Sequence, residues 1–259
     1  MKKLPWPLWM LKIRANFYKT ILINFRLLPL RDAVKLPIVL IGNVKIKGCR
    51  GCVEWINVPK IHVGMLIVGE LPDDNHGSFK KYTTRLKVQG KLVLEDHIHI
   101  RGGGSFIVGE KAIMTIGKDT MLNSFNRIWC TNSIQIGRNI RTSWEVQIFD
   151  SNFHYLIDEK GYTRRCEGNV IIGNNVWIGN RCTINKGSVL PDFCVVASGS
   201  IVNKDFSEYG EKVTIGGMPA KYLRSGFRRL FNRRIQQEVN TFFHNNPEAK
   251  DYYVGENVI

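Results

Sequence analysis

A six-residue period in the C-terminal half constrains the fold of this chain more than any other feature. Aliphatic side chains recur at every sixth position: Ile172, Ile178, Ile184, Leu190, Val196 and Val202. A second, inward-type set lies four residues after each of these: Val176, Cys182, Ser188, Cys194, Ser200 and Phe206. A helix cannot keep one face at this period, because six residues turn it by about 600°. Short strands separated by sharp turns can, so the pattern predicts a β-helix of stacked coils.

The repeat continues, less regularly, towards the N-terminus. Ile136, Thr142 and Ile148 keep the spacing of six. Three hexapeptides make one coil of about 18 residues, and neighbouring coils stack about 4.8 Å apart. The length of the segment 36–206 therefore predicts roughly eight or nine coils, once loops are allowed for. The polar segment 149–169 interrupts the repeat, and a loop of this length inside a repeat is functional or disordered.

The net charge of +15 is concentrated at the two ends of the chain. Residues 1–50 hold eleven Lys and Arg against one acid, and residues 221–259 hold seven against four, which leaves +2 for the body. No nucleic-acid-binding motif accompanies these basic residues. We expect three parts: a basic amphipathic N-terminal segment at 1–35, a β-helix catalytic domain at 36–220, and a basic C-terminal helix and tail at 221–259.

The N-terminal segment has the spacing of an amphipathic helix. Its expected apolar face consists of Ile13, Phe17, Ile21, Phe25 and Leu28, with Lys12, Lys19 and Arg26 opposite. Two explanations stay open: packing against the body with a solvated basic face, or peripheral contact with an anionic membrane. The uncharged run 4–11 is too short to span a bilayer, and no signal-peptide cleavage site follows it. We expect a cytoplasmic protein, with contact at the inner membrane face as the open question.

The C-terminal extension also has helical spacing. We expect one helix whose apolar side carries Phe227, Phe231, Ile235, Val239 and Phe242, with arginines crowded into its first half. A stack of coils needs caps at its exposed ends. The sequence therefore predicts that this helix packs over the last coil.

The six cysteines indicate a reducing compartment rather than a disulfide framework in a chain of this length. Cys49 and Cys52 form a lone CRGC pair, which is weak evidence for a zinc or redox site. His97 and His99 lie near one another in a strand-like stretch without an evident third ligand. No metal is therefore expected.

Three motifs resemble the hexapeptide-repeat acyltransferases: NVIIGNNVWIGNRCTINKG, VVASGSIVNKD and GGMPAKYLR. They occur in the family's order within 116–224, and they are most similar to its sugar O-acetyltransferases, including those of surface polysaccharide synthesis. The resemblance implies an all-β fold, a left-handed parallel β-helix of hexapeptide repeats with helical N- and C-terminal extensions. It implies transfer of an acetyl group from acetyl-CoA to a saccharide hydroxyl, in a homotrimer with each site between two subunits.

The resemblance also assigns residues on the acceptor side. His154 lies in the loop before VWIG, where the family has its catalytic His, and an imidazole can accept the proton of an attacking hydroxyl. Asp150 either orients that imidazole, holds the acceptor, or caps the loop. Asn123 matches a sugar-binding Asn of galactoside-type enzymes, and its alternative is a corner residue. The acid that the family has after this Asn is missing from Cys130-Thr131-Asn132, so acceptor recognition must differ in detail.

The donor side is assigned in the same way. The positions that match coenzyme-binding residues of the family are Trp177, Ser198, Gly199, Lys204, Lys221 and Arg224. Cationic side chains suit a polyanionic donor, although a solvated surface charge is the ordinary explanation for each of them alone.

Two other functions stay open. The same fold could acetylate an amine, as in sugar-nucleotide N-acetyltransferases. A non-catalytic β-helix could instead scaffold a glycan assembly complex through its basic ends.

Overall fold

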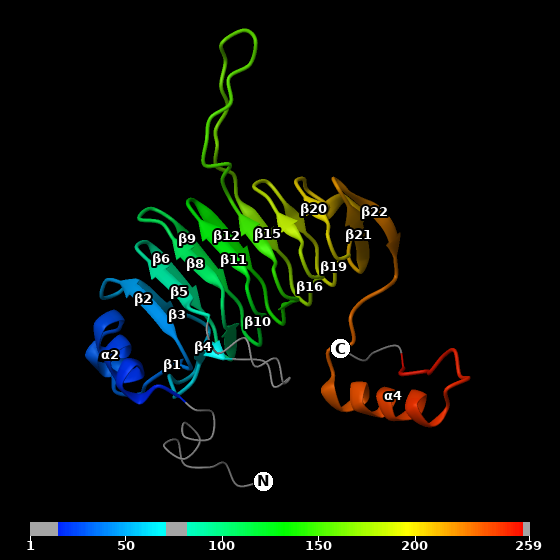
Figure 1. The fold of residues 1–259 in the computed structure, drawn as a ribbon, viewed down its shortest axis with the longest axis horizontal. Coiled ribbons are helices and arrows are strands. Elements are labelled where there is room, and N and C mark those ends of the chain that lie inside the picture. The colour runs from blue at the N-terminus through cyan, green and yellow to red at the C-terminus, as the bar shows by residue number, and fades with distance from the viewer. Residues whose placement is uncertain (1–14, 71–81, 256–259) are drawn as a thin grey trace.

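The computed structural model describes residues 15–70 and 82–255, and it shows a parallel β-helix built from three sheets (Figure 1). The first face is a sheet of β1 (Ile38–Leu40), β4 (Leu66–Glu70), β7 (Ile98–Arg101), β10 (Met121–Leu122), β13 (Arg141–Thr142), β16 (Trp177–Ile178), β19 (Val195–Val196), β21 (Val213–Gly217) and β22 (Ala220–Ser225). The second face consists of β2 (Val44–Gly48), β5 (Thr84–Val88), β8 (Ser105–Val108), β11 (Arg127–Cys130), β14 (Gln147–Phe149), β17 (Thr183–Ile184) and β20 (Ile201–Val202). The third face consists of β3 (Val53–Trp55), β6 (Lys91–Leu94), β9 (Ile113–Ile116), β12 (Ser133–Ile136), β15 (Val170–Ile172) and β18 (Val189–Leu190). The all-β fold with parallel coils is confirmed.

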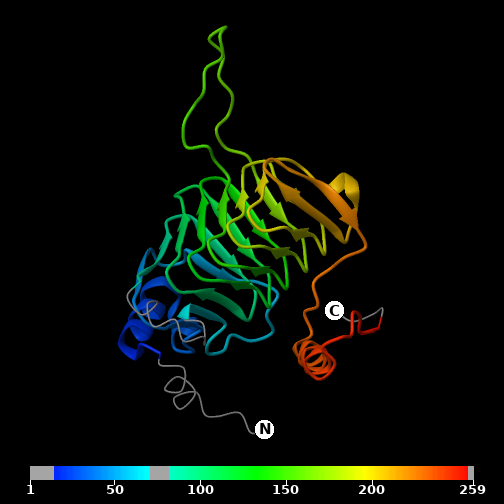
Figure 2. The ribbon, with the colours of Figure 1, turned by 45° about the vertical axis from the view of Figure 1, so that its right-hand side comes forward.

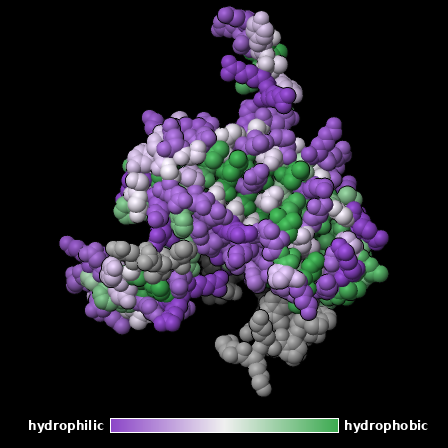
Figure 3. Space-filling view, turned by 180° about the vertical axis from the view of Figure 1, so that it is seen from behind, coloured by the Kyte–Doolittle hydropathy of each residue, from purple (hydrophilic) through white to green (hydrophobic). Residues whose placement is uncertain are grey.

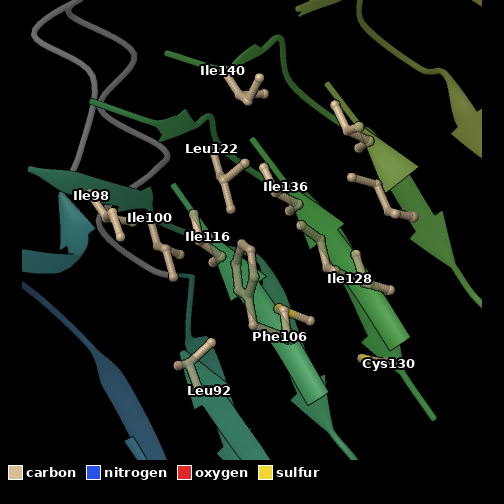
Figure 4. Packing of buried hydrophobic residues seen from close by; sticks show 14 of the residues in the cluster. Leu92, Ile98, Ile100, Phe106, Ile116, Leu122, Ile128, Cys130, Ile136 and Ile140 are labelled. Carbon is tan, nitrogen blue, oxygen red and sulfur yellow. The ribbon is translucent and has the colours of Figure 1, made fainter. Parts of the chain in front are cut away.

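The six-residue rows form the core of the molecule. The aliphatic residues from Ile172 to Val202 are at most 1% exposed, and their companions, including Ser188, Ser200 and Phe206, are fully buried. Figure 4 shows the same arrangement in the preceding coils, where aliphatic side chains from all three faces point inward around Phe106. Period six therefore marks the side chains that fill the coil.

The corner between the third and first faces explains the recurring Ile-Gly step. A Cβ on Gly137 would lie 2.5 Å from the carbonyl oxygen of Gly173 in the next coil, so the close approach of these corners requires glycine. Two residues later the backbone turns through positive φ at Asn139 and Asn175, a conformation that asparagine tolerates. The Asn139 side-chain amide donates a hydrogen bond to the Asn175 side-chain oxygen at 2.8 Å.

The described residues contain seven coils, so the prediction of eight or nine is wrong. The regular coils have the expected length, because Trp177 pairs with Val195, 18 residues later. Earlier coils are longer: Ile38 pairs with Leu66, 28 residues later, and Arg141 pairs with Trp177, 36 residues later. Corner loops take up the difference.

Helix α2 (Phe17–Leu27) covers the open end of the first coil. Its buried residues are Thr20, Ile23, Asn24 and Leu27. The Asn24 side chain exchanges two hydrogen bonds with the backbone of Ile38, at 2.6 and 3.1 Å, and the Thr20 hydroxyl accepts one from Leu40 N at 3.0 Å. These polar side chains satisfy backbone groups of the edge strand β1, which would otherwise be buried unpaired.

The predicted apolar face of this helix is therefore wrong. Ile21 is 48% exposed and Phe25 is 38% exposed, whereas Leu28 is buried just after the helix. The helix presents its polar Thr20–Asn24 side to β1, because the edge strand needs hydrogen bonds as well as apolar contact. A short helix, α3 (Leu30–Ala33), follows. The expected residues Lys12 and Ile13 lie outside the described part of the chain.

The last coil is covered by β22, not by the C-terminal helix. β22 pairs antiparallel with β21, and Tyr222 stacks on Tyr209 of the 3₁₀ helix η2 (Ser207–Tyr209) with ring centroids 5.0 Å apart. Helix α4 (Arg233–Asn245) has no buried residue and lies apart from β20 and β22 (Figure 1). The prediction that this helix caps the stack is wrong, because the β-hairpin already pairs the edge.

The two remaining global expectations concern disulfides and membrane spans. All six cysteines are free thiols, and burial raises the pKa of Cys52 to about 11. Within 15–70 and 82–255, no helix is long and apolar enough to cross a bilayer.

A buried carboxylate ties four successive coils together. Glu95 accepts hydrogen bonds from Arg138 Nε at 2.7 Å, Asn57 Nδ2 at 2.7 Å and Lys118 N at 2.9 Å. The hydrogen bond from Arg138 is the main cause that lowers the pKa of Glu95 to about 2. The charged form thus stabilises the fold above its ordinary pKa of 4.5, and this stability is lost as the pH falls through about 2.

Replacing this carboxylate tests its contribution. Glu95→Gln should lower the free energy of unfolding at pH 7 by about 2 kcal/mol, because buried hydrogen bonds to a charged group are lost. The difference from the native protein should shrink between pH 4.5 and pH 2, as the native carboxylate becomes neutral too. Urea unfolding across this range measures it, with the exposed pair residue Glu54→Gln as a control of small effect. A difference that does not change with pH would contradict the assignment.

Candidate active site

The interruption at 149–169 forms an ordered arm that projects from the stack. It leaves the corner between β14 and β15, with antiparallel bridges joining Ser151 to Glu167 and Ile157 to Thr163. Figures 1 and 2 show the arm extending away from the stack, on the side opposite the segment that leads to α4. At its base Phe153 packs edge-on against Trp129, with ring centroids 5.4 Å apart.

His154 lies on this arm, three residues after the buried Ser151, and its side chain is exposed. It lines a cavity of about 390 Å³ together with Tyr162, Arg164, Arg165 and Lys186. Among the described residues, none forms a hydrogen bond or ion pair with its imidazole. The arm therefore presents His154 to solvent, as an acceptor-facing base requires.

Asp150 is fully buried at the base of the arm. Its carboxylate accepts hydrogen bonds from Thr131 N at 2.8 Å, Thr131 Oγ1 at 2.9 Å and Asn132 N at 2.7 Å. Its backbone oxygen accepts a further bond from Gly168 N at 2.8 Å. In this chain the carboxylate holds the corner of the preceding coil, and these contacts favour the capping explanation over an orienting role for His154.

Asn123 occupies the corner between the first and second faces, after β10. Its side-chain oxygen accepts a bond from Ser124 N at 2.9 Å, and its backbone N–H donates to Thr142 Oγ1 at 2.9 Å. The hydrogen bond from Ser124 N fits the alternative considered above, a structural corner residue. It leaves the side-chain amide N–H₂ of Asn123 available for a ligand.

The predicted donor residues fall on two sides of the stack. Trp177 points outward from the first face and is 37% exposed. Ser198 and Gly199 follow β19 at the corner after that face, and Lys221 and Arg224 lie on β22 in the same sheet. Lys204 instead follows β20, where its Nζ lies 4.9 Å from the Phe206 ring centroid.

A single chain therefore does not bring the predicted base to the predicted donor groove. The arm with His154 leaves the corner between the second and third faces, whereas Trp177 lies on the first face. In a three-sided coil that corner lies opposite the first face, with the packed core between them.

Contacts of the C-terminal segment with Trp177 were missed by the sequence analysis. Arg229 Cζ lies 5.6 Å from the Trp177 ring centroid, so the segment after β22 crosses the first face. The crowding of arginines between 228 and 234 was visible in the sequence, but it was interpreted as the start of a capping helix. The helix starts later, at Arg233, with the Asn232 side chain as its cap.

One group of possible metal ligands occurs among the described residues. His62, Asp96 and His97 bring ligand atoms within 4.8 Å of one another. They belong to the connections before β4 and β7, whereas the arm with His154 leaves the stack after β14. The chemistry considered for His154 therefore makes no use of this group.

The coil stack and its arm define the class: a parallel β-helix protein with an inserted loop that presents a histidine. No family model matches the chain. It is similar to galactoside O-acetyltransferase of Escherichia coli (strain K12), 42% identical over 55 residues, which cover 21% of this chain and 26% of that protein. It is also similar to chloramphenicol acetyltransferase of Klebsiella aerogenes, 32% identical over 80 residues, which cover 29% of this chain and 37% of that protein.

Two further similarities cover most of the length of the matched protein. An Escherichia coli (strain K12) protein described as a lipopolysaccharide biosynthesis O-acetyl transferase, WbbJ, is 23% identical over 164 residues, covering 54% of this chain and 82% of that protein. The crystal structure of the polysialic acid O-acetyltransferase OatWY has a TM-score of 0.53 at 20% identity, covering 77% of this chain and 99% of that one. The structural likeness concerns the fold, the left-handed parallel β-helix. The resemblance to the hexapeptide-repeat acyltransferases is confirmed, although the chain spans only 37% of the chloramphenicol acetyltransferase and 26% of the galactoside O-acetyltransferase.

The capping role and the two functional roles considered for Asp150 give different outcomes on substitution. Asp150→Asn should lower the free energy of unfolding by about 2 kcal/mol, because an amide N–H₂ would then face the N–H groups of Thr131 and Asn132. Urea unfolding measures the loss, with the exposed Glu167→Gln at the same loop base as the control. A variant of native stability that has lost a measurable activity would instead support a catalytic role.

Proposed function

We propose that this protein transfers an acetyl group from acetyl-CoA to a hydroxyl of a saccharide, in the synthesis of a surface polysaccharide. One observation carries the proposal: an ordered arm presents an exposed His154 beside a cavity of about 390 Å³, immediately before the VWIG coil. The similarity to galactoside O-acetyltransferase and to WbbJ supports the hydroxyl acceptor and the polysaccharide.

The proposed chemistry needs one general base and no metal. His154 accepts the proton of the sugar hydroxyl as its oxygen attacks the thioester carbonyl. The C–S bond then breaks, and the imidazolium returns its proton to the leaving thiolate. Trp177, Ser198, Gly199, Lys221 and Arg224 would hold the donor along the first face and its following corner.

We further propose a homotrimer in which each site lies between two copies. The arm with His154 and the Trp177 face lie on opposite sides of one chain, so a neighbouring copy would supply the second half of each site. Side chains near the end of the arm support this, since Tyr155 is 63%, Leu156 77% and Tyr162 71% exposed. Lys204, on the same side as the arm, would then approach a donor held by the neighbour.

A cytoplasmic location with contact at the inner membrane face belongs to the same proposal. The surface of α2 and α3 supports it, because Tyr18 is 78%, Leu22 53% and Leu30 68% exposed. The basic residues Arg26 and Arg31 accompany these side chains.

Removal of the imidazole tests the catalytic step. His154→Ala should lower kcat for acetylation of a saccharide by at least about a hundred-fold, the usual contribution of a general base. Its melting temperature should be unchanged, because the side chain is exposed and outside the core. The exposed His244→Ala in α4 serves as the matched control. Full activity of His154→Ala would contradict the proposal.

The acceptor class is tested with matched amino and hydroxyl sugars. We expect acetylation of the hydroxyl sugar, and acetylation of the amine alone would identify an N-acetyltransferase. Calorimetric titration with acetyl-CoA separates an enzyme from a scaffold, because a scaffold should show no binding.

Mixed assemblies test whether a site is shared between copies. His154→Ala and Trp177→Ala subunits, each inactive alone, should regain activity when they are unfolded and refolded together. Random assembly would restore about a quarter of the sites, since each needs one intact residue from either neighbour. A mixture as inactive as its components would show that each chain carries its own complete site.

A further inference from the structure

Three arginines gather on the first face beside Trp177, and we name Arg141, Arg229 and Arg233 the arginine cluster. Arg141 lies on β13, directly paired with Trp177. The Cζ atoms of Arg229 and Arg141 lie 5.3 and 5.7 Å from the ring centroid of Phe231, so both guanidinium groups lie near this ring. The segment after β22 thus brings Arg229 to the face of the coil stack that carries Arg141 and Trp177, and Arg233 acts on Arg141 electrostatically.

Two carboxylates lie in the surroundings of the arginine cluster, Glu70 near Arg233 and Asp119 near Arg141, but within the described residues neither forms an ion pair with it. Within the described part of the chain, neither Arg229 nor Arg233 has a carboxylate at ion-pair distance. Arg141 Nη1 donates to the backbone oxygens of Ile140, at 2.9 Å, and of Asp119. Burial lowers the pKa of Arg229, and burial together with Arg229 and Arg233 lowers the pKa of Arg141 to about 10.

The carboxylates closest to the cluster are engaged by histidines. Glu70 Oε2 lies 2.8 Å from His99 Nδ1, and this hydrogen bond is the main cause that lowers the pKa of Glu70. Asp119 Oδ1 lies 3.6 Å from His97 Nδ1. Arg141 and Arg229 are partly desolvated and have no ion-paired carboxylate, and such guanidinium groups favour an anion.

The position of the cluster along the stack separates it from the predicted donor groove. Ser198, Gly199, Lys221 and Arg224 lie on the C-terminal side of Trp177, on β19 to β22 and the corner between them. Arg141 lies on the N-terminal side, in the coil that follows Asn123. If these four residues hold the donor, the arginine cluster lies on the opposite side of Trp177, which would be the acceptor side.

We infer that the arginine cluster binds the carboxylate or phosphate groups of an anionic saccharide acceptor. Planar guanidinium groups bind either group through two parallel N–H···O bonds. The rings of Trp177 and Phe231 provide apolar surface on which a sugar ring can pack beside these charges. This inference names the acceptor class and rests on the proposed function for the reaction.

Binding is measured first without turnover. A uronic-acid tetrasaccharide, its carboxyl-reduced neutral counterpart, and the neutral counterpart carrying one phosphate monoester are titrated into the full-length protein. The native protein should bind at least one of the charged probes ten-fold or more tightly than the neutral probe. The charged probe that binds more tightly shows whether the site prefers a carboxylate or a phosphate.

Variants of the cluster then test its residues. Arg229→Ala/Arg233→Ala should weaken binding of the charged probe at least ten-fold, with the neutral probe and acetyl-CoA changed less than two-fold. Arg233→Ala and Arg234→Ala are compared as single variants, because Arg234→Ala removes one positive charge at the next position, where its Nε pairs with Glu238 at 3.0 Å. The double variant keeps the coil stack, so its melting temperature and oligomeric state should be native.

Each alternative has its own result. Equal affinity of the native protein for charged and neutral probes would overturn the inference. Weaker acetyl-CoA binding in the double variant would overturn it in favour of a donor phosphate site, and an altered oligomeric state would overturn it in favour of a subunit contact. A native protein that binds the charged probe through these arginines but acetylates none of the probes would support the inference and contradict the proposed function.

Discussion

Backbone hydrogen bonds between neighbouring coils are the interaction on which the rest of the structure depends. Trp177 N donates to Cys194 O and Gly179 N to Val196 O, each at 2.9 Å, and equivalent bonds join coil to coil along all three faces. Such a ladder leaves unpaired edges at its two ends. Asn24 and Thr20 of α2 satisfy the first end, and β22 pairs with the last. The first-face edge is thus paired at both ends of the stack without α4.

The same ladder explains how a coil can carry a long insertion. The strands on either side of the arm, β14 and β15, keep their pairing with the coils before and after them. The arm therefore replaces one corner without interrupting the sheet. The carboxylate of Asp150 closes the gap, because it binds the N–H groups of Thr131 and Asn132 in the preceding coil. Asp150 therefore anchors the base of the arm that carries His154.

The hexapeptide period predicts the core correctly, since burial at every sixth residue is a property of the local sequence. The ends could not be predicted in this way. Thr20 and Asn24 are polar in a helix pattern, and their burial follows from the unpaired edge of β1, which lies elsewhere in the sequence. The hydrogen bonds of Asp150 to Thr131 and Asn132 could not be predicted for the same reason, because they depend on how neighbouring coils are aligned. The sequence shows that Arg229 is basic. Its contact with Trp177 depends on the path that the chain takes after β22, which the sequence pattern does not predict.

The geometry of one coil limits how the proposed site can be assembled. His154 follows the anchored Ser151 by three residues, so it can reach about 11 Å from that corner even when the chain is fully extended. Trp177 lies on the opposite face, with the packed core between them. The short tether and the packed core between the two residues favour a site shared between copies over a site completed by motion of the arm. In the proposed trimer, the arm of a second copy would approach the first face, where Arg141 and Arg229 lie.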